Sequence, residues 1–138
     1  PRDRRQRQMC IRDRYLIKIL QNKFDEYCKF MNNQQIDRAI KSVLELISAG
    51  NAYVDTQAPW TLKKTNKIRM EEVLYIVTNI IIKSAIMLYP IMPTSSKKIL
   101  NIFNYNMDNN KFENFTKLIN QNIKINNPEP IFPRILND

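Results

Sequence analysis

The residues with the greatest chemical potential lie in one stretch, from Asn51 to Lys64. At its centre is Trp60, the only tryptophan in the chain, which directly follows Pro59. An indole ring presented to solvent can stack on an unpaired nucleic-acid base, and such stacking tolerates any base. Polar side chains precede the ring and two lysines follow it. The stretch therefore combines the aromatic, hydrogen-bonding and cationic groups that bind unpaired RNA.

Asn51 and Asp55 are the candidate readers of base identity. They are four residues apart and so share one face of a helix. An amide can both donate to and accept from a base edge, and a carboxylate can accept the exocyclic amine of cytosine. A structural alternative stays open, in which Asp55 caps the short helix that follows. For Trp60 the corresponding alternative is packing inside the core.

Lys63 and Lys64 follow the tryptophan, and with Lys67 and Arg69 they predict a local basic patch. Neutralising phosphates in this way gives binding that depends on salt and ignores sequence. The pattern therefore favours contact with a nucleic-acid backbone next to a base-reading group.

Several kinds of catalysis are excluded by composition. The 138 residues contain no histidine and one glycine, Gly50, so histidine acid–base chemistry and a glycine-rich phosphate loop are absent from this chain. Cys10 and Cys28 form neither a metal motif nor a disulfide framework. We therefore expect no catalytic residue, no metal site and no cofactor in this chain. Two isolated cysteines fit a reducing, cytoplasmic location.

The net charge of +9 is unevenly distributed. Residues 1–14 hold six of the nine arginines and none of the thirteen lysines. This break in composition indicates two sources of coding sequence, and the segment resembles a translated sequencing-adapter read-through. The functional alternative is a basic arm that binds nucleic acid. The expected organisation is an artefactual or disordered leader at 1–14 and a single, N-terminally truncated domain at 15–138.

The apolar pattern of the remaining chain predicts an all-α helical bundle with an extended C-terminal tail. Helices are expected over about 15–31, from 36 to the residues before Pro59, over about 69–89, and from 94 to about 103. A short helical turn is expected at 59–64. Gly50 either ends the second helix as a C-cap or, through its missing side chain, lets another backbone or an RNA approach. We predict a continuous or slightly kinked helix, because Val54 preserves the apolar stripe. Three prolines extend the tail, and Ile131, Phe132 and Ile135 are expected to pin it to the bundle.

One apolar run, Val73–Met92, raises a second class of function. Its twenty residues carry a single charge, Lys83, and are long enough to span a bilayer. A charge near the centre of a span costs roughly 3 kcal/mol, which favours a buried helix instead. The alternative reading is a small helical interaction or membrane-associated protein built on this run.

Three motifs resemble the methionyl-tRNA synthetase family. The first is the stretch 51–64, which is similar to the family's Asn-x-Tyr-(Ile/Val)-Asp-x-Gln-Ala-Pro-Trp segment. The second is residues 85–93 with the following helix start at 96–100, and the third is the closing Pro-Glu-Pro-Ile-Phe-Pro-Arg-Ile at 128–135. Their order and spacing agree from about residue 15 to residue 138, and they favour methionine over the leucine, valine or cysteine enzymes.

The resemblance implies a C-terminal anticodon-binding domain of a ligase that attaches methionine to tRNA using ATP and Mg. It places Trp60 at the position of the stacking tryptophan, and Asn51, Asp55 and Pro59 at positions associated with anticodon selection. The implied partners are a methionine tRNA with a C-A-U anticodon and a catalytic domain in cis. The family's HIGH and KMSKS signatures are absent from this chain. Its further asparagine and arginine contacts would lie before residue 15.

Overall fold

The computed structural model describes residues 10–109, 111–120 and 122–136, and this part of the chain forms helices and loops without a strand. Within it, five α-helices follow one another: α2 (Ile11–Asn32), α3 (Ile36–Gln57), α4 (Pro59–Thr65), α5 (Lys67–Leu88) and α6 (Pro93–Ile102). Two 3₁₀ turns, η1 (Met107–Asn109) and η2 (Phe112–Asn114), come after α6. The predicted all-α bundle is confirmed.

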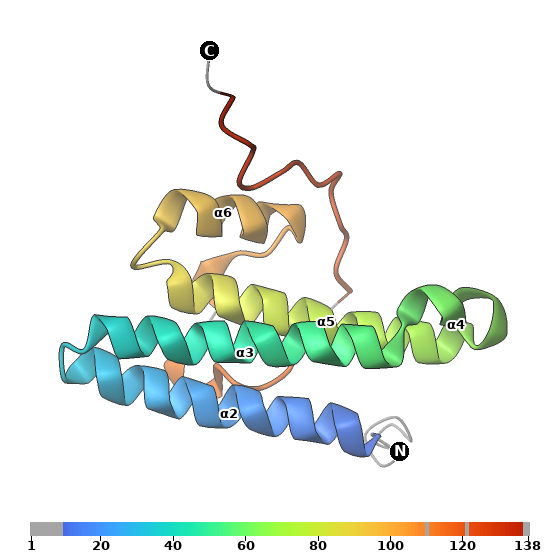
Figure 1. Ribbon diagram of the computed structural model, residues 1–138, viewed down its shortest axis with the longest axis horizontal. Coiled ribbons are helices and arrows are strands. Elements are labelled where there is room, and N and C mark those ends of the chain that lie inside the picture. The colour runs from blue at the N-terminus through green and yellow to red at the C-terminus, as the bar shows by residue number, and fades with distance from the viewer. Residues whose placement is uncertain (1–9, 110, 121, 137–138) are drawn as a thin grey trace.

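The helices α2 and α3 pack against each other as an antiparallel pair, and α5 packs along α3 (Figure 1). On α2 and α3 most buried residues recur at intervals of three and four, which directs one apolar stripe toward the neighbouring helices, whereas α5 buries consecutive residues such as 82–85. Burying each large aliphatic side chain contributes roughly 1.5–3 kcal/mol. The fully buried members of this core include Leu20, Val43, Leu46, Val73 and Met87.

The predicted continuity of the second helix is confirmed, because α3 runs from Ile36 to Gln57 without a break at Gly50. Gly50 is buried, and a Cβ atom there would lie 3.2 Å from Cγ2 of Ile80 on α5. A glycine inside a helix costs about 1 kcal/mol relative to alanine. Here the missing side chain admits the neighbouring helix α5.

The apolar run Val73–Met92 does not form one helix, because α5 ends at Leu88 and the chain then turns into α6. In Figure 1, α5 lies between α3 and α6, and ten of its residues are buried. No helix in the described ranges has both the length and the apolar composition that a bilayer crossing demands.

Lys83 is the one charge in this run and is 3% exposed. Its Nζ atom lies 5.0 Å from the centre of the Phe115 ring, a distance at which a cation attracts the ring face. Burial disfavours the charged ammonium and lowers the pKa of Lys83 to about 8. The core therefore carries a cation that is only partly compensated.

The asparagine-rich segment after α6 is held against α5 by polar side chains. The backbone N–H of Ile119 donates to Oδ1 of Asn79 at 2.7 Å, and the hydroxyl of Tyr75 donates to the Ile119 carbonyl. Beyond it the tail is extended, as predicted. The expectation that apolar residues pin the tail is wrong for Phe132 and Ile135, which are 70% and 87% exposed. The start of the tail does contact α6, because the Asn126 N–H donates to the Ile102 carbonyl at 2.7 Å.

The first described helix begins at Ile11, so residues 11–14, which were expected to belong to the leader, form the first turn of α2 in the structure. The remainder of the expected leader, residues 1–9, lies outside the described residues. Asp13 is 3% exposed, and Arg69 of α5 donates to its two carboxylate oxygens at 2.7 and 2.9 Å. The hydroxyl of Tyr53 on α3 donates to Asp13 at 2.6 Å. One carboxylate thus joins α2, α3 and α5.

The same guanidinium also reaches the end of α3. Its Nη2 atom donates to Oε1 of Gln57 at 2.8 Å, and Nη1 donates to Glu72 at 3.3 Å. Burial opposes ionisation of Asp13, but the hydrogen bonds from Arg69 and Tyr53 outweigh it and hold the pKa of Asp13 below its ordinary value. Hydrogen bonding to Asp13 likewise raises the pKa of Arg69. We call Asp13, Tyr53, Gln57 and Arg69 the polar clamp.

Replacing Lys83 by methionine should stabilise the bundle at pH 7 by about 1 kcal/mol, because a buried cation is removed and a cation–π contact is lost. The pKa of Lys83 is lowered in the folded state, so the folded protein loses its proton first as pH rises. The advantage of Lys83→Met should therefore shrink between pH 8 and 10.5. Urea unfolding across this range measures it. Lys18→Met, on an exposed site, is the control, and an advantage that grows with pH would contradict the assignment.

Replacing Asp13 by alanine should destabilise the protein by about 3 kcal/mol at pH 7, because Arg69 is left partly buried without its carboxylate. The folded-state pKa of Asp13 is lowered, so its contribution is complete above its ordinary pKa of 3.8 and is lost as pH falls further. The destabilisation should shrink in unfolding curves taken from pH 5 toward pH 3. Asp25→Ala, an exposed residue on the same helix, should change little at either pH.

Candidate nucleic-acid interface

The candidate site is a corner between two helices. α3 ends at Gln57, and Ala58 then adopts a left-handed conformation with φ 44° and ψ 63°. Ala58 precedes a proline, which disfavours the right-handed helical conformation for it. Pro59 is the first residue of α4, where its missing N–H costs nothing. The predicted break at Pro59 and the short helix after it are confirmed.

Hydrogen bonds on both sides of Ala58 hold the corner. The Ala58 N–H donates to the Val54 carbonyl at 2.8 Å, and the Thr61 hydroxyl donates to the Ala58 carbonyl at 2.7 Å. A non-glycine residue in the left-handed region is uncommon and costs energy, so such anchoring is required. The corner is therefore a defined turn.

Trp60 is presented to solvent at this corner, with 64% of its surface exposed. Its neighbour Pro59 is buried at the start of α4 and thereby anchors the turn to the bundle. The alternative that Trp60 packs inside the core is wrong. A large apolar ring this exposed at a defined turn is available to stack on a planar partner.

Asn51 and Asp55 are both exposed on the last two turns of α3. The alternative role for Asp55, capping the next helix, is not realised, because α4 has Ala58 at its N-cap and no side-chain capping bond. Tyr53 and Gln57 alternate with this pair along the helix. With about 100° per residue, they lie about 160° around α3 from the exposed pair. The buried side of α3 joins the polar clamp, and the opposite side is free to contact a ligand.

The basic residues after Trp60 are divided by the fold. Lys63 and Lys64, in the last turn of α4, are exposed, as is Lys67 at the start of α5. Arg69 is not part of the predicted patch, because its guanidinium turns inward to Asp13 and Gln57. The guanidinium forms two charge-assisted hydrogen bonds to the Asp13 carboxylate, and this bidentate pairing favours the inward position over a solvated one.

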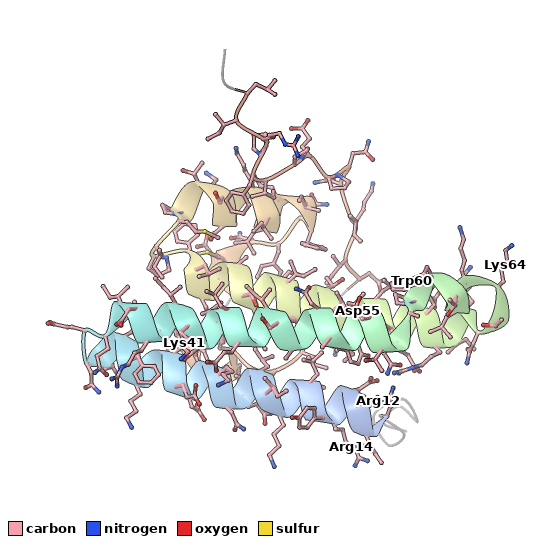
Figure 2. All side chains as sticks on the ribbon, in the orientation of Figure 1. Arg12, Arg14, Lys41, Asp55, Trp60 and Lys64 are labelled. Carbon is pink, nitrogen blue, oxygen red and sulfur yellow. The ribbon has the colours of Figure 1, made fainter. Side chains whose placement is uncertain are left out.

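Figure 2 places these groups at one end of the long axis of the molecule. Asp55, Trp60 and Lys64 follow one another where α3 turns into α4, and Arg12 and Arg14 lie at the same end, on the first turn of α2. Lys41 lies away from this end (Figure 2). This end of the molecule therefore combines exposed cationic side chains with one exposed aromatic ring, and such positive charge attracts a polyanion.

Sequence reasoning missed the polar clamp beneath this surface. Tyr53 and Gln57 lie within the same stretch as the candidate readers, but nothing in their spacing reveals a partner 40 residues earlier or 12 residues later. The alternation of readers with clamp residues on one helix was the only local signal. In the described ranges no three histidine, cysteine or acidic side chains are grouped so as to hold a metal ion.

A family model described as the anticodon-binding domain of methionyl-tRNA ligase matches residues 5–138. The methionine–tRNA ligase of Rickettsia felis is 33% identical over 110 residues, which cover 78% of this chain and 22% of the relative. That of Sulfolobus acidocaldarius is 38% identical over 87 residues, or 63% of this chain and 15% of the relative. The chain spans less than a quarter of the length of either relative.

The fold also agrees with solved structures. The apo form of methionyl-tRNA synthetase from Mycobacterium tuberculosis superposes with a TM-score of 0.85 at 20% identity, over 95% of this chain and 27% of that one. Its complex with methionyl-adenylate gives a TM-score of 0.84 at 21% identity, over 92% and 26% of the two chains. At these identities the agreement concerns the fold alone. By the family model, which covers nearly its whole length, this chain belongs to the anticodon-binding domains of methionyl-tRNA ligase.

Proposed function

We propose that the α3–α4 corner recognises the C-A-U anticodon of a methionine tRNA. The observation that carries the proposal is the 64% exposure of Trp60 at a turn anchored on both sides. A splayed anticodon base stacks on the indole, because anticodon loops present unstacked bases that proteins read in this way. Stacking supplies affinity but no choice of base.

Choice of base then comes from the exposed pair on α3. Asp55 accepts the exocyclic amine of the cytosine that begins the anticodon, and Asn51 donates to and accepts from a neighbouring base edge. Pro59 contributes by fixing the position of the Trp60 ring, because Pro59 is buried and is the first residue of α4. Lys63 and Lys64 neutralise phosphates and contribute no sequence preference.

The chemistry of the proposed ligase lies outside this chain. In the longer protein, a catalytic domain in cis activates methionine with ATP and Mg and transfers it to the tRNA, in the cytoplasm. This domain supplies the identity check. Family membership supports that division, since relatives named methionine–tRNA ligase are more than four times as long as the matched region.

Replacing Trp60 by alanine should weaken binding of a 17-nucleotide hairpin RNA with a C-A-U loop. Loss of one stacked base costs about 1–3 kcal/mol, or roughly 5- to 150-fold in Kd. Isothermal titration at fixed salt measures it. Phe132→Ala, which removes an equally exposed aromatic ring from the tail, is the control and should leave the Kd unchanged. Equal effects of the two substitutions, or no RNA binding by the unaltered chain, would refute the proposal.

Replacing Asp55 by alanine should reduce discrimination between hairpins with C-A-U and U-A-U loops. Uracil lacks the exocyclic amine, so the preference of the unaltered chain for cytosine should fall by about 1–3 kcal/mol. The ratio of the two Kd values is the readout, because it cancels any general change in charge. Asp37→Ala, at the other end of α3, tests the same change of charge away from the corner. An unchanged ratio in Asp55→Ala would remove this residue from base reading.

A further inference from the structure

We propose that Arg69 is a positioning residue for anticodon reading: it fixes the end of α3 through Gln57 and thereby fixes where Trp60 stands. The inference deepens the proposed function and rests on it. Arg69 itself contacts no base, because its guanidinium is turned inward and 18% of its side chain is exposed. It acts on the ligand through the turn that it holds.

The chain of contacts from Arg69 to the indole is short. Nη2 of Arg69 donates to Oε1 of Gln57 at 2.8 Å, and Gln57 is the last residue of α3. Ala58, the next residue, carries the left-handed turn, and Trp60 follows two residues later. Any rotation of the last turn of α3 therefore changes the orientation of the Trp60 side chain.

Arg69 is itself held rigidly on its other side. Asp13 of α2 accepts two hydrogen bonds from the guanidinium, at 2.7 and 2.9 Å, and Tyr53 donates to the same carboxylate at 2.6 Å. Asp13 and Tyr53 are both buried. A planar guanidinium in a bidentate pair is fixed in orientation as well as position. The second N–H of Nη2 is thereby directed at Gln57.

The clamp also orients the two base readers. Tyr53 and Gln57 are four residues apart and occupy the buried side of α3, whereas Asn51 and Asp55 occupy the opposite side. Two hydrogen bonds one helical turn apart prevent rotation of α3 about its axis. One partly buried arginine thus sets the direction of the indole and of both polar readers before RNA binds, which lowers the ordering cost of binding.

Trp60 is the only tryptophan in the chain, so its fluorescence reports on this corner alone. Gln57→Met removes the acceptor and keeps the length of the side chain. Time-resolved fluorescence anisotropy of the free chain should then show a larger amplitude of fast indole motion, and the Kd for the C-A-U hairpin should rise about two- to tenfold. Arg69→Lys, which loses the bidentate fork, should change both readouts in the same direction.

Gln57→Glu is the conservative rescue, because a carboxylate accepts from Arg69 in a charge-assisted bond. Indole motion in the free chain should stay as in the unaltered protein. Lys23→Met is the matched control: it breaks another α2–α3 ion pair, to Glu45, elsewhere along the two helices. Lys23→Met should leave indole motion unchanged, even where it lowers the thermal midpoint as much as Gln57→Met does.

The outcomes separate this inference from the proposed function. If the unaltered chain does not bind the hairpin, the proposed function fails, whereas the anisotropy of the free chain still tests the clamp. If Gln57→Met and Arg69→Lys leave indole motion unchanged, the positioning role is refuted even where RNA binding persists. A change of indole motion in Lys23→Met equal to that in Gln57→Met would also refute it, because general loosening of the bundle would then explain both.

Discussion

The largely buried contact between Arg69 and Asp13 is the constraint on which the arrangement of the helix ends at the candidate site depends. It brings together the first turn of α2 and the first turn of α5, and it reaches the last turn of α3 through Tyr53 and Gln57. The apolar core alone does not define these helix ends, because helix termini carry unpaired polar groups and few large apolar side chains. The directional hydrogen bonds of the polar clamp fix the positions of these helix ends, which apolar packing alone does not.

The two sides of α3 have different environments: one packs in the core and the other is exposed. Its buried side carries Val43, Leu46, Gly50 and then, near the end, the polar residues of the clamp. Its exposed side ends in Asn51 and Asp55, beyond which the chain turns through Ala58 into the helix that carries the indole. Packing of the buried side of α3 therefore also fixes the orientation of Asn51 and Asp55, the proposed base-reading residues. Gly50 contributes by letting α5 approach closely just before the last two turns.

The sequence predicted the helices well because their apolar residues recur with the helical period, and it predicted the corner because Pro59 interrupts that period. The exposure of Trp60 was one of two alternatives that the sequence left open, the other being packing inside the core, and the structure decides between them. The inward turn of Arg69 could not be predicted in the same way. Its partner is 56 residues away, in a segment set aside for its unusual composition. A local pattern shows which residues are polar, but it does not show which distant polar residue they meet.

A buried ion pair is weak evidence for stability, since the loss of hydration offsets much of the attraction between the charges. Its value here is geometric. An apolar contact at the end of α3 would tolerate rotation and sliding, whereas a guanidinium held by two carboxylate oxygens allows one arrangement with Gln57 within hydrogen-bond distance. For the proposed reading of an RNA loop by a flat ring and two polar side chains, that restriction matters more than extra stability. The contrast with Lys83 supports the argument: that cation is also buried, but it faces an aromatic ring without a carboxylate partner among the described contacts, and it orients no functional group.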